Sequence, residues 1–194
     1  MRNKVAAGKP SVAQLEAELN RVSRRRRSRD VLKGALYTLI AVASVSVLVA
    51  TLWLPILEIY GSSMTPTLHD GDVVFTIKTS ELEQGDVVAF YYNNNILVKR
   101  FIAGPGDWVD MAEDGTVYVN GEILDEPYLT ETAYGDCDIE LPTQVPDGRI
   151  FVMGDHRSTS VDSRSSSVGC VSEEQIVGKI IFRIWPSERL GDVE

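Results

Sequence analysis

Residues 34–57 read GALYTLIAVASVSVLVATLWLPIL, a stretch of 24 consecutive residues without a formal charge. As an α-helix this stretch would be about 36 Å long, at about 1.5 Å per residue, and the hydrocarbon core of a bilayer is about 30 Å thick. Trp53 and Pro55 stand near its end, where an interfacial aromatic side chain and a helix stop are expected. The apolar region of a cleavable signal peptide, the alternative interpretation, usually has only about 7–15 residues. The stretch therefore predicts one retained transmembrane helix.

The charges on either side of this stretch differ in sign. Residues 1–33 hold ten Lys and Arg against three Asp and Glu, and residues 24–27 are four consecutive arginines. The positive-inside rule then places this side in the cytoplasm and residues 58–194 outside, in a single-pass protein of the cytoplasmic membrane. Residues 34–194 hold nine Lys and Arg against twenty-five Asp and Glu. Such an acidic bulk would repel phosphate, so we expect no nucleic-acid partner.

The basic segment itself contains a short amphipathic pattern. Val12, Leu15, Leu19 and Val22 recur at helical spacing, which predicts a short helix within residues 1–33. Three helical turns rarely stand alone in water. Two interpretations therefore stay open: pairing with another copy or a partner, or a mobile tail.

Residues 58–194 are expected to be mostly β. Six apolar runs are separated by Asp-Gly, Gly-Asp and Asn-Gly turns; they read DVVFTI, DVVAFYY, ILVKRFIA, TVYVN, RIFVM and IVGKIIFRIW. Residues 116–120 predict a hairpin, because the turn dipeptide Asp114-Gly115 precedes them and Asn120-Gly121 lies at their end. Strands at this spacing favour an antiparallel β-sandwich or a distorted barrel behind the transmembrane helix.

The two cysteines, Cys137 and Cys170, fall in this outer region, where a disulfide would be allowed. Their separation in space does not follow from the sequence, so a disulfide and two free thiols both stay open. The chain has two histidines and no CxxC or HExxH spacing. We therefore expect no metal and no organic cofactor.

Lys99 is the single charge on one face of a predicted strand. On residues 95–103, alternation places Leu97, Lys99, Phe101 and Ala103 on the same side. A lysine desolvated among such neighbours has a lowered pKa, and a shift of two or three units would make it a usable base near pH 7–8. The alternative is an edge-strand lysine that reaches to water.

Two polar segments could supply partners for such a base. Residues 60–68 read YGSSMTPTL, a tight turn that would present a serine hydroxyl, although serine-rich turns usually only bond to the backbone. Residues 153–164 read MGDHRSTSVDSR, a loop that could hold an amine with hydroxyl groups and fix its own shape with an Asp–Arg pair. Taken alone, the first is more readily explained as an ordinary serine-rich turn, and a solvated polar loop is a common explanation for the second.

Together, in this order, the segments resemble bacterial type I signal peptidases. The matching motifs are SMTPTL at 63–68 with GD at 71–72, GDVV at 85–88, KR at 99–100 with GPGD at 104–107, and GDHR at 154–157 followed by Ser160 and DSR at 162–164. The resemblance covers nearly all of residues 58–186. His156 stands where the family usually has Asn.

The resemblance implies a role for five side chains. Ser63 would be the nucleophile and Lys99 the general base. Ser160 would hydrogen-bond the Lys99 amine, and Asp162 and Arg164 would pair to shape the loop. The backbone N–H of Ser63 would contribute to the oxyanion hole.

A second oxyanion donor is in doubt, because some members of the family carry a hydroxyl where this chain has Gly61. A Ser–His–Asp triad is the competing arrangement, since His69 and His156 both lie near motif residues. The sequence around Ser63, however, is not Gly-x-Ser-x-Gly. Lys99 itself argues against a related family that has His in place of the lysine.

The resemblance implies a membrane-bound serine endopeptidase that cleaves signal peptides from exported preproteins after small residues, at Ala-x-Ala sites. Ser63 lies six residues beyond the uncharged stretch, so the site would sit near the outer bilayer surface. The partners would be secreted preproteins and the lipid bilayer. One alternative is a catalytically silent, membrane-anchored β-rich binding or assembly module. A self-cleaving repressor would need a DNA-binding domain, for which residues 1–33 are too short.

Overall fold

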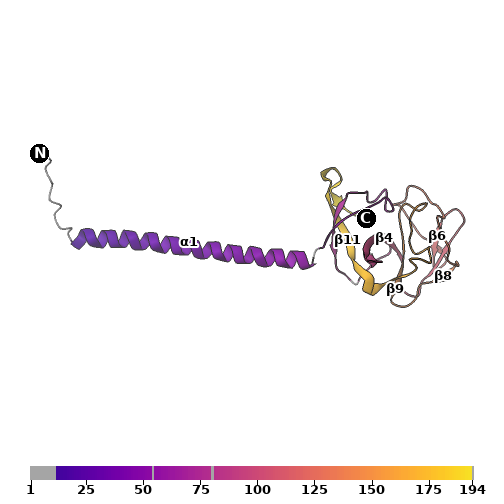
Figure 1. The fold of residues 1–194 in the computed structure, drawn as a ribbon, viewed down its shortest axis with the longest axis horizontal. Helices are drawn as coiled ribbons and strands as arrows, with labels where there is room; N and C mark the ends of the chain where they lie inside the picture. Colours follow the sequence, from indigo (N-terminus) through magenta and orange to yellow (C-terminus); the bar gives the residue numbers. More distant parts are fainter. Residues whose placement is uncertain (1–11, 54, 80, 194) are drawn as a thin grey trace. The chain divides into compact units, whose positions relative to one another are not determined.

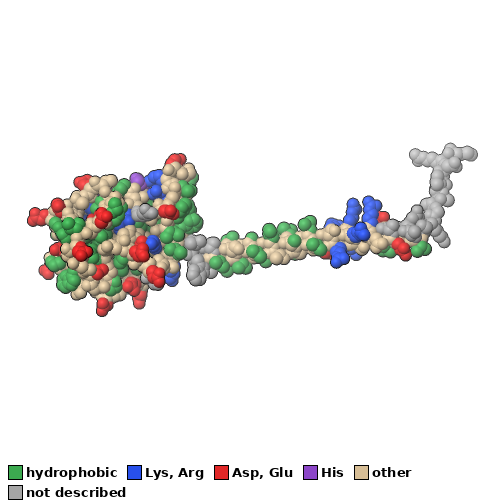
Figure 2. Space-filling model, turned by 180° about the vertical axis from the view of Figure 1, so that it is seen from behind, with side chains coloured by type: hydrophobic (Ala, Val, Ile, Leu, Met, Phe, Trp, Pro, Cys, Tyr) green, Lys and Arg blue, Asp and Glu red, His purple; other side chains and the backbone are tan. Residues whose placement is uncertain are grey.

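The computed structural model describes residues 12–53, 55–79 and 81–193 in two compact units, one ending at Thr51 and one beginning at Leu52. In the first unit, the described residues form one α-helix, α1 (Val12–Trp53), drawn in indigo to purple in Figure 1. Its stretch from Glu18 to Val49 is long and apolar enough to cross a membrane. The most apolar segment of this stretch has a mean hydropathy of 1.9, and none of that segment is buried. Figure 2 shows its basic side chains gathered on one part of the helix.

The helix differs from the expectation at both ends. The predicted short amphipathic helix and the predicted transmembrane helix are one continuous helix, because Arg, Leu and Ala are all good helix formers and nothing between them stops it. At the other end, the predicted extension to Leu57 is wrong. The helix ends at Trp53, ahead of Pro55, which has no N–H to continue it, and residues Ile56–Glu58 pair with β2 (Val73–Ile77) as strand β1.

The second unit, which begins at Leu52 and is called the outer unit after its predicted location, is built from two antiparallel sheets, which confirms the mostly β fold class. The larger sheet runs in the order β1-β2-β11-β3-β4-β9-β10, and β12 pairs with β11. Its remaining strands are β2 (Val73–Ile77), β3 (Val87–Tyr92), β4 (Asn95–Ala103), β9 (Arg149–Met153), β10 (Val171–Ser172), β11 (Ile176–Trp185) and β12 (Gly191–Asp192). Two short 3₁₀ turns, η1 (Glu173–Gln175) and η2 (Ser187–Arg189), flank β11.

The smaller sheet has the order β7-β6-β5-β8. Its strands are β5 (Trp108–Met111), β6 (Val117–Val119), β7 (Glu122–Ile123) and β8 (Thr143–Gln144). The predicted hairpin around residues 116–120 is confirmed, since β6 and β7 pair across Asn120 and Gly121. Both turn residues have positive φ, 55° and 84°, as a tight I′-type turn requires.

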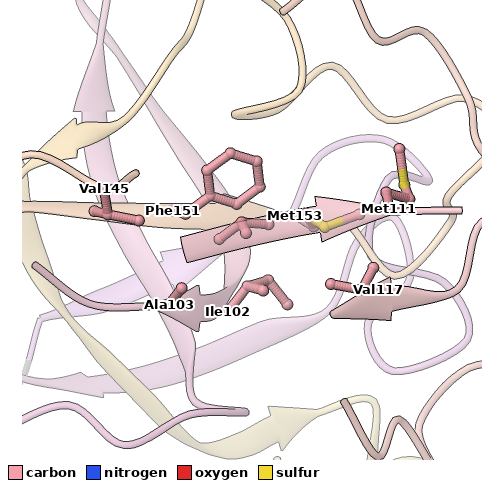
Figure 3. Packing of buried hydrophobic residues seen from close by; sticks show 8 residues of the cluster. Ile102, Ala103, Met111, Val117, Val145, Phe151 and Met153 are labelled. Atoms are coloured by element: carbon pink, nitrogen blue, oxygen red, sulfur yellow. The ribbon is translucent and has the colours of Figure 1, made fainter. Parts of the chain in front are cut away.

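Three buried clusters hold the outer unit together. The first joins the two sheets, and Figure 3 shows its side chains converging between the strands. Its members are Ile102, Ala103, Val109, Met111, Val117, Val145, Phe151 and Met153. Cys137 and Cys170 pack against this cluster as free thiols, so the disulfide is not formed.

The second cluster lies under the turn that carries Ser63, and the third lies beneath β3, β4 and β9. The second consists of Ile59, Met64, Leu68, Val74, Val87 and Ile180. The third consists of Val88, Phe90, Phe101, Ile150, Val152 and Val171. Together they bury the flanks of β4, which is where the predicted base lies.

The alternation predicted for β4 holds only up to Phe101. Leu97 and Phe101 pack in the same cluster, as expected. A register shift against β9 between Phe101 and Ala103 then breaks the period of two, and Ala103 joins Ile102 in the first cluster. The prediction that Ala103 shares the face of Leu97 is therefore wrong, because an irregular pairing turns the end of the strand.

Candidate active site

Ser63 is presented by the tight turn between β1 and β2. Met64 and Leu68 anchor the turn from below, since both side chains are buried in the second cluster. The backbone N–H of Gly61 donates to Asp70 Oδ1 at 2.7 Å, and Gly61 has a φ of +88°. A side chain would strain the backbone at this φ, which is where a glycine is favoured. The turn therefore holds Ser63 at the surface of a packed support.

Lys99 lies on β4 directly opposite this turn. Its Nζ donates to Ser63 Oγ at 2.6 Å, and its side chain is nearly buried, with 3% of the residue exposed. β4 pairs with β3 on one side and β9 on the other, so it is an inner strand. The alternative of an edge-strand lysine that reaches to water is therefore wrong.

The surroundings of Lys99 favour its neutral form. Burial lowers the pKa of Lys99 from 10.5 to about 8, while the carboxylates of Asp162 and Asp155 raise it in part and Arg164 lowers it. At pH 8, about half of the Lys99 amines are therefore free to accept a proton. An amine in this state, hydrogen-bonded to a serine hydroxyl, can act as the base that activates the serine.

The loop after β9 is tied to the Ser63 turn through its backbone. Asp162 and Arg164 form a buried ion pair with 2.8 Å between Oδ2 and Nη2, as predicted. Asp162 also accepts the backbone N–H of Gly154 at 2.9 Å. The backbone N–H of His156 donates to the carbonyl oxygen of Ser63 at 3.0 Å. The ion pair thus shapes the loop, and the loop in turn holds the serine.

Ser160 does not make the predicted hydrogen bond to the Lys99 amine. Its Oγ is buried and has no hydrogen-bond partner within the described ranges. The side chain packs against Gly154 instead, so closely that a Cβ at position 154 would overlap Ser160 Oγ and lie 2.6 Å from the carbonyl oxygen of Ser63. The Lys99 amine donates to Ser63 and not to Ser160, so the predicted Ser160–Lys99 hydrogen bond is absent among the described residues.

Five further charged or aromatic residues lie near the Ser63–Lys99 pair, and the sequence analysis gave none of them a role. Arg100 is buried and donates from Nε and Nη2 to both oxygens of Asp155, at 2.9 and 2.7 Å. Tyr128 stacks on the Arg100 guanidinium, and Glu126 pairs with the buried Arg157. The sequence held a signal for the Arg100–Asp155 pair, because Arg100 lies within an apolar strand and Asp155 just after one, where a buried charge needs a partner. Nothing in the local sequence marks Glu126 or Tyr128.

Ser63 and Lys99 open onto two adjoining hollows. The first has a volume of about 640 Å³, and its walls are residues 57–61 on one side and 94–99 on the other. The second, of about 620 Å³, shares Ser63 and Lys99 and extends toward Val161 and Val168. The pair therefore lies where an extended chain could pass from one hollow into the other.

A Ser–His–Asp triad is not formed within the part of the chain that the structure describes. His156 contacts Ser63 only through its backbone N–H. The Nδ1 atoms of His69 and His156 are buried without a hydrogen-bond partner among the described residues. Ser63 Oγ is bonded to Lys99 instead.

Much of the chain is similar to known proteins. Residues 31–185 match the family described as signal peptidase, peptidase S26. Signal peptidase IB of Staphylococcus aureus is 43% identical over 148 residues, which cover 66% of this chain and 76% of the relative. Signal peptidase I T of Bacillus subtilis is 41% identical over 142 residues, 65% of this chain and 71% of the relative. A solved signal peptidase I from Enterococcus faecalis V583 is 30% identical with a TM-score of 0.45, covering 53% of this chain and 98% of its own.

Proposed function

Because this chain belongs to the S26 family of signal peptidases, and is thus a serine endopeptidase that cleaves signal peptides, we propose that Ser63 and Lys99 are its catalytic residues. One observation carries the proposal: the 2.6 Å hydrogen bond between Lys99 Nζ and Ser63 Oγ, made by a lysine that is nearly buried. Burial lowers the pKa of this lysine to about 8, which supplies a base at the pH of an extracytoplasmic compartment.

The proposed reaction is acyl transfer in two stages. Ser63 Oγ attacks the carbonyl carbon of the scissile peptide bond while the neutral Lys99 amine takes its proton. The Lys99 ammonium then gives that proton to the leaving nitrogen, so the carbon–nitrogen bond breaks and an ester on Ser63 remains. In the second stage, Lys99 takes a proton from water as the water attacks the ester. Returning this proton to Ser63 Oγ releases the acid and restores the enzyme.

The developing oxyanion needs a donor near Ser63. Within the described residues the backbone N–H of Ser63 donates to no protein acceptor, so we assign it to the oxyanion. Position 61 offers no hydroxyl, and the N–H of Gly61 is already bonded to Asp70. The Ser63 N–H is accordingly the one oxyanion donor that this proposal names.

The substrate proposed is a preprotein with small residues at positions −1 and −3 before the scissile bond, an Ala-x-Ala site. Apolar side chains support this choice, because Leu57, Ile59, Met64 and Leu97 all contribute to the first hollow. Small side chains on an extended substrate can enter such a hollow without carrying a charge out of water. The preprotein is thus selected by the size of two residues rather than by its whole sequence.

Anchoring in the same membrane would bring the site close to its substrate. We propose that α1 crosses the cytoplasmic membrane with its arginine-rich end in the cytoplasm and that the outer unit lies on the far side. Ser63 follows Trp53 by ten residues, which can span at most about 36 Å. A preprotein held in the same bilayer by its signal helix would present its cleavage site within this reach.

The test is cleavage of a preprotein carrying an Ala-x-Ala site by the full chain in detergent. Wild type, Ser63→Ala, Lys99→Ala and the exposed-lysine control Lys78→Ala are compared, and the product N-terminus is read by mass spectrometry. We expect cleavage after the final Ala by wild type and Lys78→Ala, and a loss of at least about a hundredfold in the other two variants. Equal cleavage by Lys99→Ala would contradict the proposed base and return attention to the histidines. A folded wild type that cleaves nothing would favour the binding module.

A further inference from the structure

A short segment outside both hollows contacts the groups behind Ser63 and Lys99. Tyr128 lies in the loop after β7, with its ring centroid 3.7 Å from Arg100 Cζ. Its hydroxyl donates to Glu126 Oε1 at 2.9 Å, and Glu126 in turn accepts from both Nη atoms of Arg157. Neither Tyr128 nor Glu126 lines the hollows that Ser63 opens onto. Their contacts are therefore with the catalytic support and not with a substrate.

The two arginines that this segment contacts hold the start of the loop after β9. Arg100 donates to both carboxylate oxygens of Asp155 and also to the carbonyl oxygen of Gly85. Arg157 donates from Nε to the carbonyl oxygen of Gly154 at 3.1 Å. Arg100 thus holds Asp155, and Arg157 holds Gly154.

That stretch of the loop contacts Ser63, and the arginine that holds it adjoins Lys99. Gly154 packs against the carbonyl oxygen of Ser63, and the next residue but one, His156, donates its backbone N–H to the same oxygen. Arg100 directly follows Lys99 on β4. A displacement of Arg100 or of residues 154–156 would therefore change the distance between Lys99 Nζ and Ser63 Oγ.

Electrostatics links the same groups to the base. The charged groups that act on Lys99 are Asp162, Asp155 and Arg164, and Arg100 neutralises Asp155 by pairing with it. A ring over one face of a guanidinium excludes water and leaves the donors in the plane for a carboxylate. With the Tyr128 ring removed, Arg100 would be held less rigidly against Asp155, so it would neutralise less of the Asp155 charge that raises the pKa of Lys99.

We propose that Tyr128 is a positioning residue for the reaction of Ser63 and Lys99, acting through Arg100, with Glu126 as its anchor on Arg157. This inference rests on the proposed function. The ring supplies the contact with Arg100, and the hydroxyl ties the ring to Glu126. Burial and the neighbouring Glu126 carboxylate raise the pKa of Tyr128, so its hydroxyl stays protonated and continues to donate.

The experiment compares Tyr128→Leu, Tyr128→Phe and Tyr91→Leu in the full chain, with an Ala-x-Ala preprotein as substrate. Tyr91 is an exposed tyrosine on β3 and serves as the matched control. For Tyr128→Leu we expect kcat to fall about tenfold, KM to stay within about twofold, and the acid limb of the pH profile to move to higher pH. Tyr128→Phe keeps the ring, so it should recover most of kcat and the wild-type acid limb. Tyr91→Leu should match wild type.

A folded Tyr128→Leu with wild-type kcat and an unmoved acid limb would overturn the proposal. A lowered melting temperature with an unmoved acid limb would also overturn it, since that is the outcome of a purely structural role. If Tyr128→Leu does not fold, Glu126→Gln takes its place, with the same direction of change expected in kcat and in the acid limb. A wild type without cleavage would instead count against the proposed function, so the two failures are distinguishable.

Discussion

At the scale of single residues, Lys99 combines a cost in stability with a gain in reactivity. It is nearly buried, and its side-chain amine donates to Ser63 Oγ. The folded state prefers the neutral amine, because burial lowers the pKa of Lys99 from 10.5 to about 8. The unfolded chain therefore binds more protons than the folded one between these two values. Protonation of this group opposes folding below pH 8, and the cost fades as the pH rises toward 10.5.

Replacing Lys99 by the apolar Met should therefore stabilise the outer unit while abolishing cleavage. A pKa difference of about 2.5 units corresponds to about 3 kcal/mol at pH 7, an upper bound because the hydrogen bond to Ser63 is lost as well. The measurement is denaturant unfolding of wild type and Lys99→Met at pH 7 and pH 10.5. We expect the variant to be more stable at pH 7 and the difference to shrink at pH 10.5. A variant that is less stable at pH 7 would show that Lys99 is not strained by burial.

At the scale of elements, an ion pair and backbone hydrogen bonds within the loop after β9 hold together parts of the site that are far apart in sequence. The buried Asp162–Arg164 pair closes the loop on itself, and Arg164 also donates to the carbonyl oxygens of Tyr134 and Arg157. The bond to Tyr134 crosses from this loop to the segment between β7 and β8 of the smaller sheet. The loop is therefore a junction between the two sheets as well as a support for Ser63.

Asp162→Asn should weaken this junction. The substitution removes the charge that the buried Arg164 requires, and breaking a buried pair in this way costs about 3–5 kcal/mol. Chemical denaturation followed by tryptophan fluorescence measures the change, and Asp147→Asn, at an exposed position, is the control. A midpoint for Asp162→Asn equal to that of wild type would mean that the ion pair does not hold the loop.

Several of these elements follow from the sequence, and the exceptions have physical reasons. Alternation and turn residues were enough to predict the mostly β outer unit and the β6–β7 hairpin, because both depend on neighbours along the chain. The end of α1 was placed too far along, because the span was drawn to the last uncharged residue, Leu57, although Pro55 was recognised as a helix stop. Ser160 was assigned to Lys99 by resemblance, but its contact depends on how closely Gly154 packs. Tyr128 could not be found, since its partner Arg100 is 28 residues away in sequence.

At the scale of the whole molecule, charge is divided unevenly along the chain. Residues 1–33 are basic, whereas residues 104–148, which contain the small sheet, hold twelve Asp and Glu and no Lys or Arg. Figure 2 shows acidic side chains spread over the outer unit. Glu126 is partnered by Arg157, but most of these carboxylates lie at the surface, where they repel one another.

Salt should therefore stabilise the outer unit. Raising NaCl from about 0.01 to 0.15 M shortens the Debye length from about 30 to 8 Å and weakens the repulsion. We expect the melting temperature to rise by about 2–4 °C, which corresponds to about 1 kcal/mol for a chain of this size. KCl should act equally, because screening does not depend on the identity of the cation. A melting temperature that falls with either salt would show that favourable ion pairs outweigh the repulsion.

The pH dependence of kcat/KM tests the central claim, that a neutral Lys99 activates Ser63, most directly. Cleavage of an Ala-x-Ala preprotein by the full chain is measured from pH 6 to pH 10. The account predicts that kcat/KM rises with pH along an acid limb with an apparent pKa of about 8, because the base must lose its proton before it can act. An acid limb near pH 6.5, the ordinary value of a histidine, or a profile that is flat across this range would contradict it.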